Sequence, residues 1–177
     1  MKNTKFSFNR AWLFLTALLM SALVAVSFAG CKSDDDDDDL PSGVEYLSSD
    51  SLLVGTWKSS YGEIFEISTT ELKNGGSWGN CYAGNNLTVR KISDSAGIVY
   101  IKYTRSIIYG SVDYSETAPD VGKWYAVSYK NLTDDAVALC GAYKEGGATS
   151  TETLDEAVSE FTIENGYFDS YSDCTRQ

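Results

Sequence analysis

Short segments in which apolar and polar residues alternate, separated by turn-forming residues, make up most of this chain after residue 50. The clearest segment spans 98–105, where Val99, Ile101 and Tyr103 alternate with more polar neighbours. A repeat of two residues sends successive side chains to opposite faces of an extended chain, so each segment predicts a half-buried strand. The same pattern predicts strands at 55–59, 63–68, 70–73, 86–92, 106–111, 123–131, 136–143 and 166–171, with loops at 74–84 and 112–121.

One helix is expected to interrupt the strands before the last of them. Thr153 and Glu156 have the spacing of a capping box, in which each side chain bonds the backbone of the other residue. Apolar residues at helical spacing form a stripe that has to pack against another element: Leu154, Ala157, Val158 and Phe161.

Many short antiparallel strands joined by tight turns fold into a sandwich or a closed barrel. We expect the barrel, because closure leaves no exposed strand edge to pair with a neighbouring molecule. The predicted fold is therefore mainly β, a closed or nearly closed antiparallel barrel of about eight strands with one short C-terminal helix.

The first 30 residues have the composition of an export signal. Basic residues at positions 2, 5 and 10 precede a mostly apolar segment at 11–29, and Ala29-Gly30 offers a small-residue cleavage site. The end of this segment, residues 23–31, resembles the lipobox of bacterial lipoproteins. That resemblance implies that Cys31 becomes the first residue and carries a lipid, which would be the protein's membrane contact. A retained membrane helix is the alternative, because roughly 20 apolar residues can span a bilayer.

An acidic run, Asp34 to Asp39, follows the cysteine closely. Adjacent carboxylates repel one another and stay extended, so this run is expected to be a solvated stalk. A weak calcium site and a surface-export signal, which such runs resemble in some Gram-negative lipoproteins, are the other interpretations. We therefore predict a signal peptide at 1–30, a lipid-anchored acidic linker at 31–50 and a barrel domain at 51–177, held in the cell envelope on the periplasmic side or the cell surface.

The absence of histidine removes several classes of function. Without histidine the chain cannot form a Ser-His-Asp or Cys-His site, or a zinc site that needs imidazole. The acidic pairs Asp134-Asp135 and Asp155-Glu156 have structural explanations at a turn and in the first turn of the helix. We expect no catalytic residues, no metal site, no cofactor and no enzymatic activity. The net charge of −11 also disfavours nucleic acid as a partner, because it repels the phosphate backbone.

Three cysteines remain if Cys31 carries a lipid, namely Cys81, Cys140 and Cys174. The compartment outside the inner membrane permits disulfides, and three thiols allow one bridge and one leftover cysteine. Cys140 lies in the middle of a predicted strand, where a free thiol packs as a small apolar group. We favour a Cys81–Cys174 bridge, which would fix the C-terminal tail, while the other two pairings stay open.

Gly55-Thr56-Trp57 opens the first predicted strand and resembles the Gly-x-Trp signature of lipocalin and related calycin barrels. The segments at 122–127 and 153–157 are similar to those of lipocalin-like lipoproteins from spirochaetes and related bacteria. The resemblance covers roughly residues 52–172. It implies that Trp57 plugs one end of the barrel, that the late helix packs outside it, and that a ligand would enter at the opposite mouth.

The tyrosine content suggests what such a ligand would meet. All 12 tyrosines follow Cys31, and tyrosine combines an apolar ring with a hydroxyl that needs a partner when buried. The candidate binding residues on predicted strands are Tyr100, Tyr103, Tyr125, Tyr129 and Lys102. In the alternative arrangement, half of the tyrosines face solvent and the rest fill the core.

Two hypotheses about function follow. The first is a membrane-anchored barrel that binds a small hydrophobic or amphipathic ligand. The second is a surface interaction or adhesion protein with a filled barrel, whose loops at 74–84 and 112–121 bind macromolecules. The sequence leaves the identity of the ligand and the oligomeric state open.

Overall fold

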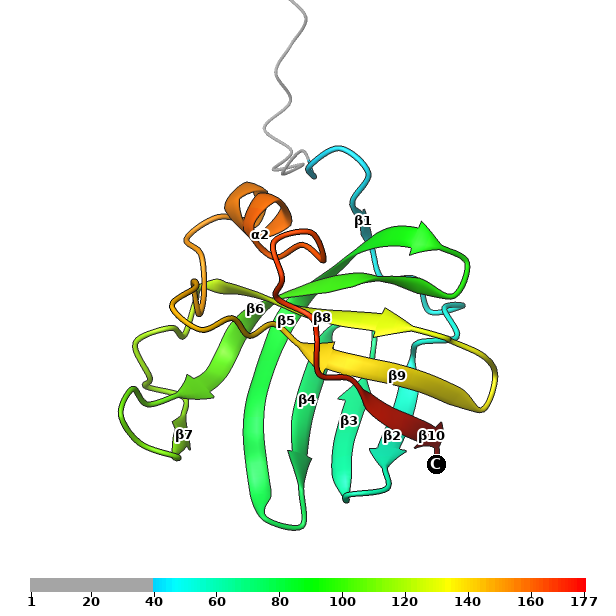
Figure 1. Cartoon of the computed structure of the whole chain (residues 1–177), viewed down its shortest axis with the longest axis horizontal. Coiled ribbons are helices and arrows are strands. Elements are labelled where there is room, and N and C mark those ends of the chain that lie inside the picture. The colour runs from blue at the N-terminus through cyan, green and yellow to red at the C-terminus, as the bar shows by residue number, and fades with distance from the viewer. Residues whose placement is uncertain (1–39) are drawn as a thin grey trace, which may run out of the picture. The chain divides into compact units, whose positions relative to one another are not determined.

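The computed structural model describes residues 40–177 (Figure 1). The predictions for the signal peptide, for Cys31 and for the acidic run lie outside the described residues. The strands are β1 (Glu45–Tyr46), β2 (Gly55–Ser59), β3 (Glu63–Ile67), β4 (Glu71–Gly76), β5 (Gly79–Ser93), β6 (Ala96–Ile107), β7 (Tyr114–Ser115), β8 (Trp124–Lys130), β9 (Ala136–Gly141) and β10 (Ser172–Arg176), and the helix is α2 (Leu154–Glu160).

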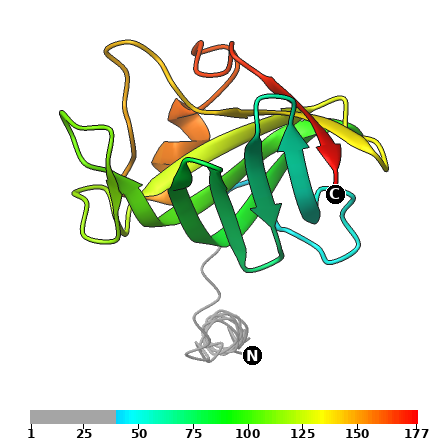
Figure 2. The ribbon, with the colours of Figure 1, turned by 90° about the horizontal axis from the view of Figure 1, so that it is seen from below.

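Eight of the strands form a closed antiparallel barrel, which confirms the predicted fold class. They hydrogen-bond in the order β5-β4-β3-β2-β10-β9-β8-β6, and pairing of β5 with β6 closes the ring. Figure 2 shows the strands curving around a common interior. The short strands β1 and β7 attach to β5 and β6 outside this ring.

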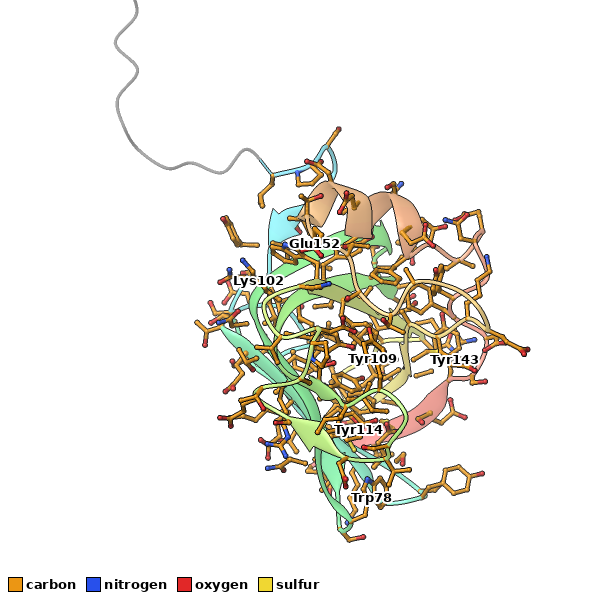
Figure 3. All side chains as sticks on the ribbon, turned by 90° about the vertical axis from the view of Figure 1, so that its left-hand side faces the viewer. Trp78, Lys102, Tyr109, Tyr114, Tyr143 and Glu152 are labelled. Carbon is orange, nitrogen blue, oxygen red and sulfur yellow. The ribbon has the colours of Figure 1, made fainter. Side chains whose placement is uncertain are left out.

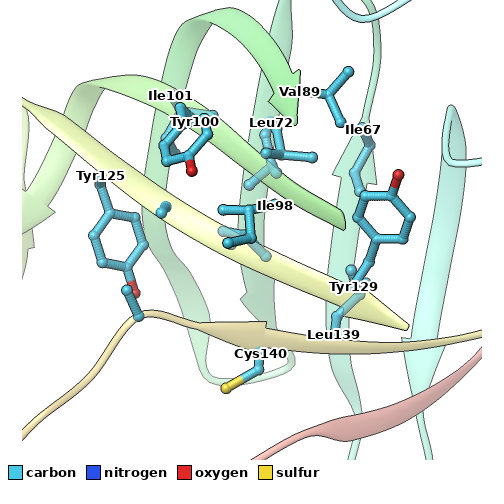
Figure 4. Close-up of a cluster of buried hydrophobic side chains, with 14 of the residues drawn as sticks. Ile67, Leu72, Val89, Ile98, Tyr100, Ile101, Tyr125, Tyr129, Leu139 and Cys140 are labelled. Atoms are coloured by element: carbon cyan, nitrogen blue, oxygen red, sulfur yellow. The ribbon is translucent and has the colours of Figure 1, made fainter. Parts of the chain in front are cut away.

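Alternate residues of each strand fill the interior. Trp57 is paired with Phe65, and Val99 is paired with Val89 on one side and with Val127 on the other. Directly paired residues share a face, and all five of these side chains are buried. Figure 4 shows part of the buried cluster, to which strands from opposite walls contribute.

Helix α2 has the predicted capping box and packs outside the barrel against β6 and β8. The Thr153 hydroxyl accepts a hydrogen bond from the Glu156 amide, and the Glu156 carboxylate accepts one from the Thr153 amide. Ala157 and Phe161, both from the predicted apolar stripe, are fully buried. Tyr100 belongs to the outer face of β6, opposite to that of Val99 and Ile101, so it contributes to this outer layer.

The segment at 74–84 is a hairpin and not the predicted loop. Strand β4 continues through Gly76, and β5 begins at Gly79. Asn74 is buried and donates from Nδ2 to Glu63 Oε1 at 2.9 Å. A Cβ on Gly75 would lie 2.8 Å from the Gly79 carbonyl oxygen, so glycine here permits close approach of the two strands. The turn residues that suggested a loop therefore form the tip of a hairpin.

The ends of the domain also differ from the prediction. The last strand is Ser172–Arg176, because Tyr167 and Phe168 are both buried and the alternation of a strand begins only after them. The predicted strand at 106–111 is instead the end of β6 followed by a turn, and β7 lies in the predicted loop at 112–121. Strand β1 lies inside the predicted linker at 31–50, where Leu47 is buried against the barrel.

Candidate functional site

A cavity of about 220 Å³ lies at one end of the barrel, and we call it the tyrosine cavity. Five tyrosines line it together with residues from the neighbouring loops: Tyr82, Tyr103, Ser106, Ile107, Tyr114, Asp120, Tyr125, Ala142, Tyr143, Lys144, Ala148 and Thr149. The lining comes from β5, β6, β7, β8, the connection between β7 and β8, and the segment after β9. Figure 3 shows Tyr109, Tyr114 and Tyr143 from this side of the molecule.

Three buried or half-buried tyrosines make up the inner wall of the tyrosine cavity. The rings of Tyr103 and Tyr125 stack with centroids 4.7 Å apart and an interplanar angle of 20°. Tyr82 meets Tyr125 edge to face at 5.3 Å. Such pairs contribute roughly 0.5–1.5 kcal/mol each beyond the burial of their area. The inner wall is therefore held in place by its own packing, without a ligand.

Strand register brings these rings together. Tyr103 is paired with Gly84, and Tyr125 with Ile101, so both rings belong to the inner face of the barrel. Gly141 lies opposite Val127 on the same face. A Cβ on Gly141 would lie 2.5 Å from the Tyr125 hydroxyl oxygen and 3.2 Å from that of Tyr82. Glycine at this position therefore makes room for two tyrosine hydroxyls.

Asp120 supplies a carboxylate to the wall of the tyrosine cavity. Its side chain is only 3% exposed. Asp120 Oδ2 accepts a hydrogen bond from the Tyr109 hydroxyl at 2.6 Å and one from the Thr149 hydroxyl at 3.1 Å. Asp120 Oδ1 accepts no hydrogen bond from any residue between 40 and 177. The carboxylate is thus oriented by two hydroxyls and keeps one oxygen for a further donor.

The tyrosines of the inner wall are neutral at physiological pH. Burial raises the pKa of Tyr82, of Tyr103 and of Tyr125 above its usual value, because a phenolate would lose its hydration there. The nearby tyrosines raise the pKa of Tyr103 further. These side chains therefore line the cavity with aromatic rings and uncharged hydroxyls.

The opposite end of the barrel is closed by Trp57. Its ring is fully buried, and its Nε1 donates to the Leu53 carbonyl oxygen at 2.8 Å. The Arg176 guanidinium lies over the ring at 4.1 Å and donates to the carbonyl oxygens of Leu52, Val54 and Asp134. A side chain at Gly55 would overlap this guanidinium. The Gly-x-Trp segment thus has a structural reason for both of its named residues.

The residues predicted to bind a ligand are divided among three places. Tyr103 and Tyr125 line the tyrosine cavity. Tyr100 and Lys102 belong to the opposite face of β6, where Tyr100 is paired with Ala126 and Lys102 with Trp124. Tyr129 lies towards the other end, beside a surface hollow of about 290 Å³ that Leu47, Asp94 and Leu132 also line. That hollow is larger but lacks the converging aromatic rings of the tyrosine cavity.

Several residues of the two ends were not predicted from the sequence. Tyr82 and Asp120 lie in segments predicted to be loops, and no local pattern marks either as lining a cavity. Arg176 is the second-to-last residue of the sequence, and only the pairing of β10 with β2 places it opposite Trp57. The sequence signal that could have placed Arg176 is alternation of residues at 172–176, which would have indicated a strand there.

The prediction of a disulfide between Cys81 and Cys174 is wrong, because neither cysteine is bonded to another. Cys81, Cys140 and Cys174 are free thiols. Cys81 is on β5 and Cys174 on β10, which are four strands apart in either direction around the ring. A disulfide needs Cα atoms within roughly 7 Å, whereas adjacent strands alone are about 4.8 Å apart. Cys174 is instead buried in the core, which raises the pKa of its thiol to about 12.

Between residues 40 and 177, no three His, Cys, Asp or Glu side chains gather closely enough to hold a metal ion. The same part of the chain contains no helix with the length and apolarity to cross a membrane. Comparison with known proteins gives no match to a family model, to a curated protein or to a solved structure.

Proposed function

We propose that this protein is a lipid-anchored lipoprotein of the bacterial cell envelope, and that its lipocalin-like barrel binds a small amphipathic ligand in the tyrosine cavity. The observation that carries the proposal is the convergence of five tyrosines and one buried carboxylate on a single hollow at one end of the barrel. Ligand sites are commonly concave, lined mainly by apolar and aromatic groups, with a few polar groups that orient the ligand.

The size of the hollow limits the ligand. Buried side chains fill much of the barrel interior, and the lining of the tyrosine cavity does not reach Trp57. A volume of about 220 Å³ is below the range of about 300–1,000 Å³ that holds drug-sized molecules. The ligand is therefore a small molecule, or one small group of a larger molecule whose remainder stays outside.

The mouth of the tyrosine cavity suits an amphipathic molecule. Tyr143 is 72% exposed and lies at the rim, whereas Tyr103 and Tyr125 are buried at the inner wall. Asp120, Thr149 and the rim hydroxyls supply polar partners. An apolar or aromatic group would contact the inner rings, and a polar group would remain near the loops.

A cavity-filling variant tests ligand binding. The protein would be purified from its own cells and examined by native mass spectrometry for a retained small molecule. Ala148 lines the tyrosine cavity, so Ala148→Trp should remove the retained molecule. Ala136→Trp is the matched control, because Ala136 is exposed at the opposite end of β9. Retention of the same molecule at equal occupancy in both variants would contradict the proposed site.

Anchoring through Cys31 is tested separately. Cells grown with a labelled fatty acid should incorporate the label into the unchanged protein, and Cys31→Ser should abolish both the label and fractionation with membranes. Two or more acyl chains bind a bilayer firmly, since each buried methylene contributes about 0.8 kcal/mol. Membrane fractionation of an unlabelled Cys31→Ser protein would contradict lipid anchoring and leave the ligand proposal untouched.

Exposed aromatic residues favour surface interaction as a second candidate function. Trp78 at the tip of the β4–β5 hairpin is 59% exposed, and Tyr61 between β2 and β3 is 86% exposed. A Cβ on Gly62 would be 3.8 Å from the Trp78 ring, so the two tips are neighbours. Exposed aromatic side chains are typical of the centres of protein interfaces. Under this proposal, Trp78→Ala would abolish binding to a partner surface while leaving small-molecule retention unchanged.

A further inference from the structure

We infer that the tyrosine cavity selects a small organic cation, such as a primary amine carried on a short apolar or aromatic body. This inference rests on the proposed function, and it adds the charge of the ligand. Four features of the cavity carry it: the oriented Asp120 carboxylate, the aromatic wall, the positions of the nearby lysines, and the limited volume.

Asp120 provides an acceptor that is already in place. The Tyr109 hydroxyl donates to Asp120 Oδ2 at 2.6 Å, and the single proton of the Thr149 hydroxyl is shared between Oδ2 at 3.1 Å and the Tyr109 oxygen at 2.6 Å. The two hydroxyls fix the plane of the carboxylate and neutralise only part of its charge, because hydroxyls are dipoles and not cations. Asp120 Oδ1 has no donor within the described part of the chain. Glu152 and, to a smaller extent, the charge of Asp120 raise the pKa of Lys123, yet Lys123 forms its ion pair with Glu152 and not with Asp120. A buried carboxylate is costly unless it is paired directly, and an ammonium group in the cavity would supply a direct partner.

The aromatic wall also favours a cation over an anion. Tyrosine rings carry negative charge on their faces, so they attract a cation within about 6 Å and repel an anion. Tyr103 and Tyr125 stack and so cover one face of each other's ring. Tyr82, Tyr114 and Tyr143 bring three further rings to the cavity. Because burial keeps these hydroxyls neutral, the attraction comes from the rings and not from phenolates.

The lysines near the cavity have other contacts. Lys123 Nζ forms an ion pair with Glu152 Oε1 at 2.9 Å. Lys144, which lines the mouth of the cavity, has its Nζ 5.5 Å from the ring centroid of Tyr167. Neither lysine forms an ion pair with Asp120 in the part of the chain that the structure describes. Among the described residues that line the cavity, Lys144 at the rim is the one cation, and an anionic ligand there would also face the Asp120 carboxylate.

Three probe molecules of nearly equal shape but different charge distinguish among preferences for cationic, neutral and anionic ligands. Phenethylamine is cationic, phenethyl alcohol is neutral and phenylacetate is anionic at neutral pH. Binding to the full-length protein would be measured by calorimetry and by shifts of backbone amide resonances. We expect phenethylamine to bind about tenfold or more tightly than phenethyl alcohol, since a charge-assisted hydrogen bond is roughly twice as strong as a neutral one. Phenylacetate should bind most weakly of the three.

The variant Asp120→Asn tests how much the negative charge of the carboxylate contributes to affinity. The amide oxygen can still accept from Tyr109 and Thr149, so the variant retains acceptor geometry but loses the negative charge. Affinity for phenethylamine should fall about tenfold, whereas affinity for phenethyl alcohol should stay unchanged. Asp113→Asn is the matched control, because Asp113 is an exposed carboxylate in the same segment between β6 and β8, and it should alter neither affinity.

Each outcome has a distinct meaning. Equal or tighter binding of phenethyl alcohol or phenylacetate to the unchanged protein would overturn the inference and leave the proposed cavity in place. Absence of shifts near 103–125 and 142–149 with all three probes would contradict the proposed function itself. If Asp120→Asn does not fold, the order of the three probes on the unchanged protein still decides the question.

Discussion

The two ends of the barrel differ in the side chains that occupy them. At one end, Trp57 fills the interior, and Arg176 covers it with a cation–π contact and hydrogen bonds to three backbone carbonyls. At the other end, Tyr103 and Tyr125 stack on each other and leave a hollow of about 220 Å³. Both ends use large aromatic rings, but only one end leaves a hollow among them with a buried carboxylate in its wall.

At each end of the barrel a glycine leaves space for a neighbouring side chain, and the groups that occupy this space differ. Gly55 leaves room for the Arg176 guanidinium over Trp57, and Gly141 leaves room for the hydroxyls of Tyr125 and Tyr82. At Gly55 the space is taken by a charged group that closes the barrel. At Gly141 it is taken by two hydroxyls that face the inside of the mouth. The two ends therefore differ less in aromatic content than in the polar groups around the rings, which are a guanidinium at one end and hydroxyls with a carboxylate at the other.

The largest expected effect is on stability at the Trp57 end. Trp57→Ala should lower the free energy of unfolding by about 3–5 kcal/mol, because it leaves a cavity in a fully packed region. Trp78→Ala is the matched control and should cost less than about 0.5–1 kcal/mol, since Trp78 is exposed. Urea unfolding followed by circular dichroism measures both. Similar losses in the two variants would show that Trp57 is not a structural closure.

The next effect compares the two glycines. Gly55→Ala and Gly141→Ala should each lower the free energy of unfolding by about 1–3 kcal/mol, because each added methyl group overlaps a packed side chain. Only Gly141→Ala should also change affinity for phenethylamine, since only its methyl group would displace tyrosines that line the cavity. Unfolding curves and calorimetry on the same samples check this. Loss of affinity in Gly55→Ala alone would reverse the roles assigned to the two ends.

A third effect depends on pH and concerns the tyrosine end. In the folded protein the pKa of Tyr103 and of Tyr125 is above the usual value of about 10 in an unfolded chain. Folding therefore favours the protonated form, so this stability is fully present below pH ~10 and is lost as pH rises above ~10. Tyr103→Phe should make stability less sensitive to pH in that range, measured as urea midpoints at pH values on both sides of ~10. An unchanged slope would contradict the burial of this hydroxyl.

The smallest effect on stability is expected at the rim. Tyr143→Ala should change the free energy of unfolding by less than about 0.5 kcal/mol, because the side chain is 72% exposed. It should nevertheless weaken phenethylamine binding, since Tyr143 lines the mouth. Tyr46→Ala is the control, because Tyr46 on β1 is also exposed but does not line this cavity. Equal affinities in the two variants would remove Tyr143 from the site.

The strands with a strict two-residue repeat were predictable from the sequence. The segment at 98–105 lies within β6, and Thr153 with Glu156 forms the predicted capping box. Both depend on local spacing, which a sequence displays directly. The hairpin at 74–84 was not predictable in this way. Its glycines permit close approach of the two strands that the turn connects, and that contact is not visible in the local spacing of residues. Turn-forming residues mark a reversal of the chain but do not show whether pairing continues up to it.

The site was predictable only in part, for a related reason. Two of the four candidate tyrosines, Tyr103 and Tyr125, lie on the cavity wall, because their parity on β6 and β8 matches the inner face. Parity also places Tyr100 on the outer face. Parity gives no position along the barrel axis, and Tyr129, although it has inner-face parity, lies towards the other end. Asp120 comes from a connection whose path depends on tertiary packing, and no periodic signal accompanies it. Residues from loops therefore complete a candidate site whose inner wall comes from the strands.

A titration followed by backbone amide resonances tests most directly whether the tyrosine end of the barrel is the binding end. Phenethylamine would be titrated into the isotope-labelled full-length protein while amide resonances are recorded. We expect saturable shifts at 103–125 and 142–149, around the lining residues of the tyrosine cavity, and unchanged resonances around Trp57 and Arg176. Shifts gathered at the Trp57 end, or none at saturating probe, would contradict this expectation.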